Sequence, residues 1–277
     1  MRGALIHTPK RNAPPAMTKT KITLSVISHG QGDLVRQLLA DVEACCAGDV
    51  GVIVTHNIPE PVKFRDSDYS FPLVVIQNQE RKGFAANHNQ AFHQGFGDYF
   101  CIVNPDVRLV GNPFPALRDA LAEADVGVVG PAVLNVRGEI EPSARKFPTL
   151  QSIMRKVLAW KPLHDYSEAT ATREPDWIAG TFMMFKSEAY ARIGGVDERY
   201  FLYYEDVDLC ARLRIIGLRV VLEPNVRIIH DASRRSWGNL YYMMIHARSM
   251  LRFLKKRPSN LGKGRPEQSI SARGLRP

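Results

Sequence analysis

The sequence lacks any hydrophobic run long enough to cross a membrane, since none approaches the ~18 uninterrupted apolar residues that a span requires. Residues 1–21 also lack the apolar centre of a secretory signal. Cysteine is scarce: the four cysteines include an adjacent pair, Cys45 and Cys46, and no two have the C-x-x-C spacing. Such a set does not form a framework of ordinary disulfides. We therefore expect reduced, mostly buried thiols and a cytoplasmic protein.

Acidic residues are nearly missing from the two ends of the chain. Residues 1–21 contain five Lys or Arg and no acid, and residues 255–277 contain seven with a single acid, Glu267. These ends carry +5 and +6 of the net charge of +9, which leaves residues 22–254 at −2. A slightly acidic body argues against a nucleic-acid partner. We predict that residues 1–21 and 256–277 are flexible basic ends, which either contact an anionic membrane at the inner face of the cell or stay solvated.

Two common nucleotide-binding motifs are also missing. Gly30-Gln31-Gly32 offers only the first half of the dinucleotide motif G-x-G-x-x-G, because Val35 stands where the third glycine belongs. No Walker A lysine motif is present. These absences exclude a Rossmann dehydrogenase and a P-loop nucleotidase.

The elements that are present alternate between strand and helix over the first 130 residues, which predicts a mostly parallel α/β sheet. Periodicity predicts strands at 23–28, 50–55, 73–76 and 100–103, and helices at 33–44 (capped by Asp33), 84–96 and 113–124. Further along, it predicts helices at 150–160, from 205 onward and at 239–255, strands at 177–185 and 227–230, and a loop at 161–176.

Polar residues follow four of the predicted strands, at the carboxyl edge where open α/β sheets bind ligands. They are Ser28, His29 and Gly30, then His56 and Asn57, then Asn78, and finally Asn104 and Asp106. Pro105 cannot donate to a strand ladder and ends the fourth strand. This convergence predicts a nucleotide or sugar pocket, in which Asp106 would bind a metal or a sugar hydroxyl. The alternative is that Asp106 only caps a turn.

Two further segments supply groups that suit a sugar. Lys82, Gly83 and Phe84 open a helix whose free N–H groups face the same edge, and Asn87 and Asn89 add neutral donors and acceptors. Asn87 could instead simply cap that helix. Farther on, Trp177 precedes Gly180 within a predicted strand, where an aromatic ring beside an open backbone suits the apolar face of a sugar. A core tryptophan packed on a bulge is the equally plausible alternative.

Three carboxylates follow the aromatic run at residues 200–204. The apolar spacing places Glu205, Asp206 and Asp208 in the first turn of a helix, where the helix dipole stabilises anions. We expect Asp208 to pair with Arg212 at i,i+4, leaving Glu205 and Asp206 to face the pocket and abstract a proton. The alternative is the ordinary acidic bias of a helix N-terminus. His230 then ends a short strand, before a basic loop at residues 231–237 that contains Arg234.

The order of these motifs resembles the inverting glycosyltransferases of family 2, in particular their rhamnosyltransferase-like members. The motifs are Lys82-Gly83-Phe84 with Asn89, Asn104-Pro105-Asp106, Ala179-Gly180-Thr181, Gly194-Gly195-Val196-Asp197, residues 201–208, and His230. The resemblance covers residues 22–255. It implies a GT-A fold, in which a Rossmann-like, mostly parallel sheet has helices on both faces, followed by a smaller acceptor-side portion and a C-terminal helix. Residues 22–131 would form the nucleotide-sugar half and residues 132–255 the acceptor and catalytic half.

The same resemblance implies a nucleoside-diphosphate sugar donor and a divalent cation, Mg²⁺ or Mn²⁺. Asp106 and His230 would hold the cation, and Asp206 would be the general base, with Glu205 beside it. The expected substrate-binding residues are Ser28, His29, Gly30, His56, Asn57, Asn78, Lys82, Gly83, Phe84, Asn89, Asn104, Trp177, Gly180, Thr181 and Arg234. The acceptor would be a polysaccharide, a lipopolysaccharide or a lipid-linked glycan, and the sugar could be rhamnose.

Two positions depart from the family pattern. His56-Asn57 stands where family members usually place Asp-Asn, and Asn104 stands where many carry a second acid of the metal motif. A single carboxylate holds a cation weakly, so His230 or the diphosphate would have to complete the shell. These departures motivate an alternative, a catalytically silent sugar-nucleotide or glycan-binding module of the same fold. Sugar transfer or sugar-nucleotide hydrolysis by the purified protein would exclude that alternative.

Overall fold

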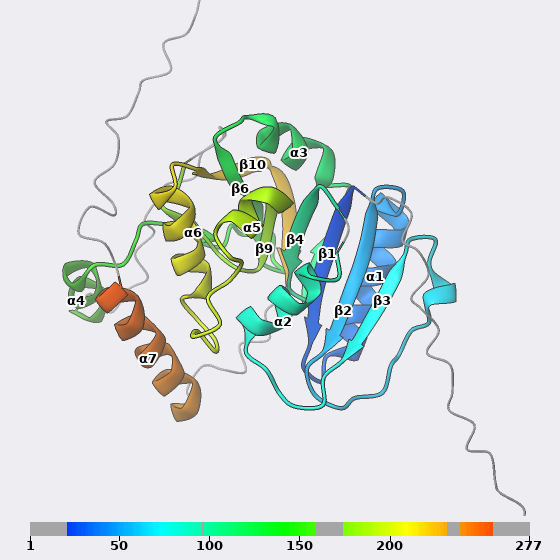
Figure 1. Ribbon diagram of the computed structural model, residues 1–277, viewed down its shortest axis with the longest axis horizontal. Helices are drawn as coiled ribbons and strands as arrows, with labels where there is room; N and C mark the ends of the chain where they lie inside the picture. Colours follow the sequence, from blue (N-terminus) through cyan, green and yellow to red (C-terminus); the bar gives the residue numbers. More distant parts are fainter. Residues whose placement is uncertain (1–20, 96, 159–173, 232–238, 257–277) are drawn as a thin grey trace, which may run out of the picture.

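The computed structural model describes residues 21–95, 97–158, 174–231 and 239–256. Within them, eight strands form one sheet in the order β3-β2-β1-β4-β9-β6-β10-β5 (Figure 1). These strands are β1 (Ile22–Ser28), β2 (Val50–His56), β3 (Leu73–Gln77), β4 (Tyr99–Val103), β5 (Val107–Leu109), β6 (Val126–Leu134), β9 (Phe182–Lys186) and β10 (Arg219–His230). The predicted α/β class and mostly parallel sheet are confirmed.

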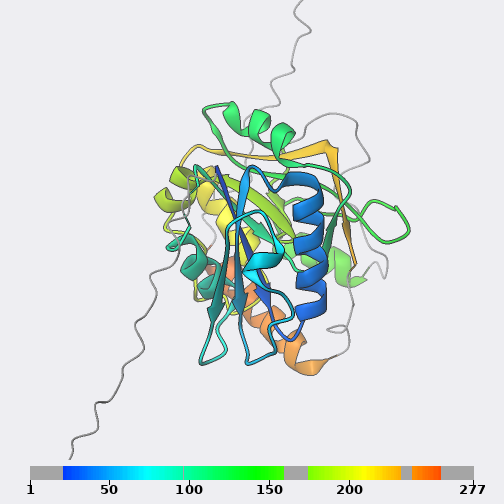
Figure 2. The same cartoon turned by 90° about the vertical axis from the view of Figure 1, so that its right-hand side faces the viewer.

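The parallel half of the sheet consists of β3, β2, β1 and β4, with β2 buried along its whole length. Helix α1 (Gly32–Cys46) packs its apolar stripe against one face, and α2 (Phe84–Phe92) lies against the other (Figures 1 and 2). Strands buried on both faces explain the continuous β-branched runs of the sequence. They also give the molecule two apolar cores, one on each side of the sheet.

The second half of the sheet is mixed. Strand β9 runs antiparallel to both β4 and β6, β10 runs parallel to β6, and the short β5 pairs antiparallel with the end of β10. Residue 131, the predicted boundary between two halves, lies inside β6, so the strands on either side of that boundary belong to a single sheet.

The predicted strand at 177–185 is wrong in one respect, because it is divided at Gly180. Strand β8 (Trp177–Ile178) pairs with β7 (Ala144–Arg145) in a separate two-stranded sheet, and β9 begins only at Phe182. The Gly180 N–H donates to the Asp206 carboxylate instead of to a neighbouring strand. The chain therefore changes sheets at the point where it meets a predicted catalytic residue.

The remaining helices are α3 (Phe114–Ala122), α4 (Leu150–Leu158), α5 (Ser187–Arg192), α6 (Glu205–Ile215) and α7 (Leu240–Lys256), with a short 3-10 helix at Asp66–Asp68. Two helix ends differ from prediction. Helix α2 stops at Phe92, and the N-cap of α1 is Gln31, because Asp33 lies within the first turn and pairs with Lys63. In the described part of the chain, no helix is both long enough and apolar enough to span a bilayer.

Several predictions concern residues outside the described ranges. They include the flexible ends, most of the loop at 161–176, and Arg234. The cysteines lie within those ranges and carry free thiols, with Cys46, Cys101 and Cys210 buried and Cys45 partly exposed, as expected.

Candidate functional site

A cavity of about 880 Å³ opens at the carboxyl ends of β1, β2 and β4. It lies at the sheet edge where the sequence places polar residues. The predicted site residues that line it are His29, Gly30, Asn57, Lys82, Phe84, Asn104, Asp106, Gly180, Thr181, Glu205 and Asp206. We call this cavity the donor cavity, after the nucleotide-sugar donor that the sequence resemblance implies. It brings Asp106 and Asp206, which are far apart in the chain, into one lining.

Three buried asparagines fix the wall of the donor cavity. The Asn57 side chain accepts the Lys82 N–H at 2.8 Å and donates to the Lys82 carbonyl at 2.9 Å. Asn78 donates to the side-chain oxygens of Asn57 and Asn87, and Asn87 donates to the Gly83 carbonyl at 3.0 Å. Asn78 thus supports the lining from behind. This chain of bonds holds the Lys82-Gly83 turn, which explains why asparagine is tolerated inside α2.

Gly83 joins this turn to the opposite wall. A β-carbon at Gly83 would lie 2.9 Å from the backbone oxygen of Phe201, and the Phe84 N–H donates to that same oxygen at 2.9 Å. Only a residue without a side chain permits this approach. Gly83 therefore positions Lys82 and Phe84, which line the cavity, while it lies outside the lining.

Two predicted strand-end residues point into the protein. Ser28 and His56 are neighbours in register, and both are fully buried outside the donor cavity. The Ser28 hydroxyl accepts the Gln31 N–H, while the His56 ring lies 3.5 Å from Glu60 and has a pKa lowered by burial. Side chains alternate along a strand, so the residues that reach the cavity are the next ones, His29 and Asn57.

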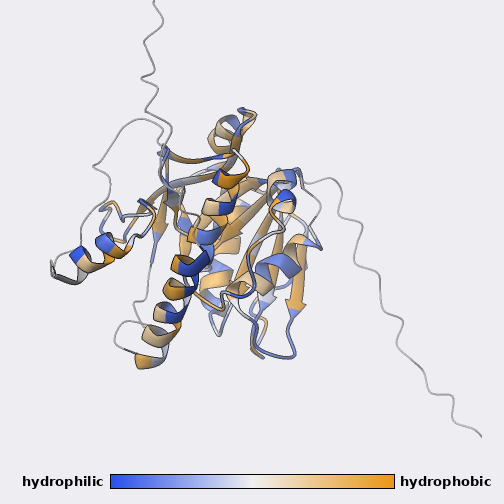
Figure 3. Ribbon diagram, turned by 60° about the vertical axis from the view of Figure 1, so that its left-hand side comes forward, coloured by the Kyte–Doolittle hydropathy of each residue, from blue (hydrophilic) through white to orange (hydrophobic). Residues whose placement is uncertain are grey.

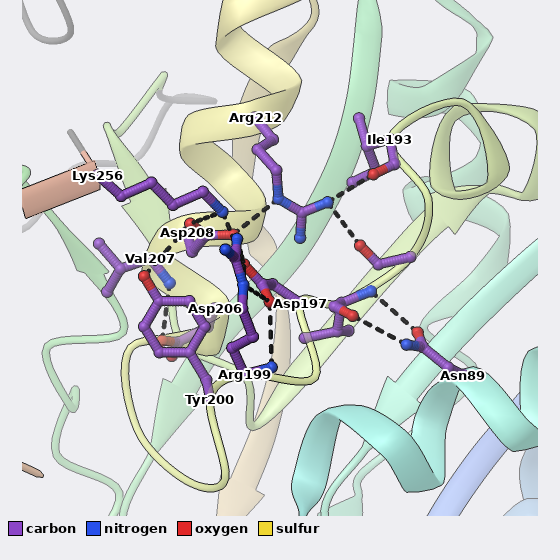
Figure 4. A network of polar contacts seen from close by, with 12 residues as sticks. Asn89, Ile193, Asp197, Arg199, Tyr200, Asp206, Val207, Asp208, Arg212 and Lys256 are labelled. Atoms are coloured by element: carbon purple, nitrogen blue, oxygen red, sulfur yellow. Dashed lines mark hydrogen bonds and ion pairs between the residues drawn. The ribbon is translucent and has the colours of Figure 1, made fainter. Parts of the chain in front are cut away.

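Asn89 also lies away from the donor cavity. Its side chain donates to the Val196 carbonyl at 2.8 Å and accepts the Val196 N–H at 2.9 Å (Figure 4). A β-carbon at Gly195 would lie 2.4 Å from the Asn89 oxygen, so the Gly194-Gly195 turn closes tightly over this side chain. Asn89 connects α2 to the turn that follows α5.

A second cavity of about 790 Å³ adjoins the first, and we call it the acceptor-side cavity, after the acceptor portion that the sequence resemblance implies. Trp177 lines it, with the Trp177 indole N–H donating to the Lys146 carbonyl and the Arg145 guanidinium 5.6 Å from the ring centroid. The two cavities share Ala179, Tyr203, Glu205, Asp206 and Tyr242. Asp206 therefore lies where the two cavities meet.

The two carboxylates at the start of α6 have different environments. Asp206 accepts the Gly180 N–H at 3.0 Å and the Val207 N–H at 2.8 Å; burial raises its pKa, and these bonds partly offset the rise. Burial and the Asp206 charge raise the pKa of Glu205 well above its ordinary value, and one Glu205 oxygen is buried without a partner. Glu205 thus holds a proton more readily than an ordinary glutamate, and the backbone hydrogen bonds of Asp206 favour its charged form.

The turn before α6 is strained. Tyr203 and Tyr204 both have left-handed backbones, with φ of 68° and 66°, which costs on the order of 1–3 kcal/mol for each such residue. Ring contacts with His246, at centroid distances of 5.3 and 5.2 Å, hold both tyrosines in place. These two left-handed residues lead the chain into α6, whose first residues, Glu205 and Asp206, line both cavities.

Asp208 in the same turn faces the other way (Figure 4). It pairs with Arg212 at 2.7 Å, as predicted from the i,i+4 spacing, and with Lys256 of α7 at 2.6 Å. Arg212 in turn donates to the carbonyls of Ile193 and Gly195. This network connects α6, the helix that carries Glu205 and Asp206, to the C-terminal end of α7.

Asp106 lines the other end of the donor cavity, and His230 lies beside Asp106, outside the lining. The β5–β10 pairing brings His230 opposite Val107, which places the His230 Nε2 atom 3.5 Å from the Asp106 Oδ1 atom. The His230 Nδ1 atom lies 2.9 Å from Glu141. Burial alone would lower the pKa of His230, but its contacts with Asp106 and Glu141 outweigh that effect and raise it to about 9.

These residues fit a divalent cation in part. The Asp106 Oδ1 atom is buried without a hydrogen-bond partner, and it faces an imidazole nitrogen, so an oxygen and a nitrogen donor meet at one point. No group of three or more His, Cys, Asp or Glu side chains is arranged to hold a metal ion within the described ranges. Further ligands would have to come from the diphosphate of a bound nucleotide.

Several residues that the sequence analysis did not assign contribute to the site. Phe201, Tyr203 and Tyr242 line the donor cavity, and Glu141 holds His230. The aromatic run at 200–204 was a usable signal for the first two. Tyr242 and Glu141 carry no local signal, because they reach the site only through the packing of α7 and the loop after β6.

The chain is similar in sequence to known glycosyltransferases and similar in fold to solved structures. No protein-family model matches the chain. It is 30% identical over 173 residues to the N-acetylglucosaminyl-diphospho-decaprenol L-rhamnosyltransferase of Mycobacterium tuberculosis, covering 58% of this chain and 56% of that protein. It is 24% identical over 253 residues to the rhamnosyltransferase WbbL of Escherichia coli, covering 85% and 93%. The chain thus spans about half the length of the mycobacterial relative.

Solved structures share the architecture. The mannosyltransferase PcManGT from Pyrobaculum calidifontis, in complex with GDP-Man and Mn²⁺, has a TM-score of 0.60 at 16% identity, covering 90% of this chain and 67% of that one. GalNAc-T7 with UDP, GalNAc and Mn²⁺ has a TM-score of 0.63 at 13% identity, covering 84% and 48%. The chain has the GT-A fold of these glycosyltransferases, and the two curated relatives named above, which it resembles in sequence, are rhamnosyltransferases.

Proposed function

We propose that this rhamnosyltransferase-like chain is an inverting, metal-dependent glycosyltransferase, with rhamnose the first candidate for the sugar it transfers. The donor would be a nucleoside-diphosphate sugar bound in the donor cavity, and the acceptor a lipid-linked or polysaccharide glycan that enters from the acceptor-side cavity. One observation carries the proposal: Asp206 lies where the two cavities meet, while Asp106 lines the same donor cavity at the end of β4.

Asp206 suits the role of general base. Its raised pKa makes it a stronger base than an ordinary aspartate, and the Gly180 and Val207 N–H groups fix its orientation. It would take the proton of an acceptor hydroxyl, whose oxygen then forms a bond to the anomeric carbon as the bond to the diphosphate breaks. A single displacement of this kind inverts the configuration at that carbon.

Asp106 and His230 would hold the cation, with diphosphate oxygens completing its shell. A bound divalent cation would neutralise the charge that develops on the leaving diphosphate. Glu141 would fix the orientation of His230 through their 2.9 Å contact and so compensate for Asn104, which replaces a second acid. Binding would release the proton that these side chains otherwise share.

The test is nucleotide binding by titration calorimetry, using dTDP-rhamnose with and without Mn²⁺. Asp106→Ala should remove the Mn²⁺-dependent part of the affinity, whereas Asp206→Asn should leave it within about threefold because Asp206 acts on the acceptor. Asp119→Ala, which removes an exposed carboxylate from α3, is the matched control and should bind as the wild type does. Binding that ignores Mn²⁺ in the wild type, or that survives intact in Asp106→Ala, would contradict the assignment.

A further inference from the structure

Helix α7 lies on the outside of the molecule (Figures 1 and 3), and most residues of its apolar face are exposed. At 3.6 residues per turn, seven residues fall within about 120° of one another on this helix. They are Leu240, Met243, Met244, Ala247, Met250, Leu251 and Leu254. Four of them are largely exposed: Leu240 (69%), Met243 (59%), Met244 (57%) and Leu251 (53%). We call these seven residues the outer stripe.

The opposite side of α7 is fixed to the protein, so the outward direction of the stripe is settled. Ser249 and Phe253 are buried, and the Ser249 hydroxyl donates to the Leu202 carbonyl at 2.9 Å. Phe253 stacks near Phe147, and Lys256 pairs with Asp208 of α6. A helix held in this way cannot turn its outer stripe inward without breaking these contacts.

The charged residues beside the outer stripe are all basic. Helix α7 contains no acidic residue, and Arg248 and Lys255 are exposed along one edge of the stripe. Residues 257–277 continue with five more Lys or Arg and one acid. An apolar stripe with a basic edge is the pattern of a helix that lies in the headgroup region of an anionic bilayer.

Other occupants fit this surface less well. A second copy of the chain would place its own Arg248 and Lys255 against those of the first, bringing like charges together. Residues 257–277 are also basic and contain few large apolar residues, namely Leu261, Ile270 and Leu275, so they lack the side chains needed to cover the stripe. An anionic lipid surface offers both apolar chains and negative charge.

The stripe also meets the acceptor-side cavity, because Met243 belongs to both. Leu150 and Met154 of α4 are exposed too, at 69% and 64%, and neighbouring α4 residues line the same cavity. We propose that α7 docks on the anionic surface of a bilayer through its outer stripe, with the acceptor-side cavity opening beside the lipid. This placement rests on the proposed function only in calling that cavity the acceptor side.

The experiment is co-sedimentation of the full chain with phosphatidylcholine vesicles that contain one-third phosphatidylglycerol, and with vesicles of phosphatidylcholine alone. The wild type should bind the anionic vesicles. The double variant Met244→Gln/Leu251→Gln keeps the charge but removes two large apolar groups from the stripe, and should lower the partition coefficient at least about tenfold. Arg248→Gln/Lys255→Gln should weaken binding to the anionic vesicles only.

The matched control is Val110→Gln/Val136→Gln, which changes two equally exposed apolar residues away from α7 and should bind as the wild type does. Equal binding by Met244→Gln/Leu251→Gln would assign the attraction to the basic ends and overturn the proposal, as would a wild type that binds neither vesicle. A wild-type dimer in light scattering that the same variant dissociates would assign the stripe to a second copy. Since no step uses turnover, dTDP-rhamnose affinity measured on the same samples separates this result from failure of the proposed function.

Discussion

At the scale of single residues, Glu205 and Asp206 show how burial can shift the pKa values of two neighbouring carboxyl groups to different extents. Both begin α6, yet Asp206 receives two backbone N–H groups while one Glu205 oxygen has no partner. The unequal solvation raises the pKa of Glu205 well above its ordinary value, while the backbone hydrogen bonds of Asp206 partly offset the rise in its own pKa. When Glu205 is protonated, Asp206 has no second negative charge beside it, so repulsion between the two carboxylates is avoided.

The free energy of unfolding should report the state of Glu205. A carboxyl whose pKa is raised by folding holds its proton more tightly in the folded chain, so stability falls as pH rises above its ordinary pKa of 4.5. Glu205→Gln removes this loss. Above pH 4.5, the free energy of unfolding of the variant should therefore rise relative to that of the wild type by up to about 1.4 kcal/mol per pH unit. This rise should stop at the raised pKa of Glu205.

Urea unfolding of both proteins near pH 4 and near pH 8 checks this directly, because titrating groups other than Glu205 and its neighbour Asp206 are common to both proteins and cancel in the difference. A stability difference that is the same at both pH values would show that Glu205 ionises normally in the folded protein.

The pH profile of turnover should report Asp206. As the proposed base, Asp206 would work only when deprotonated, and burial raises its pKa above the ordinary value of 3.8. We expect kcat/KM to rise with pH along an acid limb whose midpoint lies above that value, since protonation at lower pH removes the base. Initial rates of sugar transfer between about pH 4 and pH 8 locate this limb. A rate independent of pH across that interval would argue against a carboxylate base.

At the scale of elements, the site depends on a contact between α2 and the turn that precedes α6. Gly83 lies against the Phe201 backbone, and the Phe84 N–H bonds to the same carbonyl. Gly83→Ala would force that backbone apart, which should cost about 1–3 kcal/mol of stability and lower donor affinity by moving Lys82. Gly111→Ala is the control, since a β-carbon there meets no atom within 4 Å.

Thermal unfolding and dTDP-rhamnose titration of the two alanine variants measure both effects. If Gly83→Ala and Gly111→Ala behaved alike in both measurements, the close approach would have no part in holding the cavity wall.

The elements of the parallel half could be read from the sequence because β-branched runs and apolar stripes are local. The division at Gly180 could not, since it depends on an N–H that finds Asp206, a residue distant in sequence. The sequence also does not show which strand-end side chains face the cavity. Ser28 and His56 end their strands on the buried face, and of these four residues only His29 and Asn57 reach the cavity. The register that decides this is a property of the whole sheet.

At the scale of the whole molecule, the site lies between the carboxyl edge of the main sheet and elements outside that sheet. The carboxyl ends of β1, β2 and β4 supply the donor cavity, while β8 and α6, with α7 packed beside them, form the acceptor side. The convergence of polar strand ends and the acidic start of α6 were predictable from motif order. The contribution of Tyr242 was not, because it depends on how the last helix returns across the molecule.

The proposed assignment of Asp206 as the base between two cavities is most directly tested by the single-turnover rate of transfer from dTDP-rhamnose to a lipid-linked glycan acceptor. With Mn²⁺ and saturating donor, Asp206→Asn should transfer about 10²- to 10⁴-fold more slowly than the wild type, while its donor affinity is retained. Transfer by Asp206→Asn within a few-fold of the wild-type rate would contradict this account.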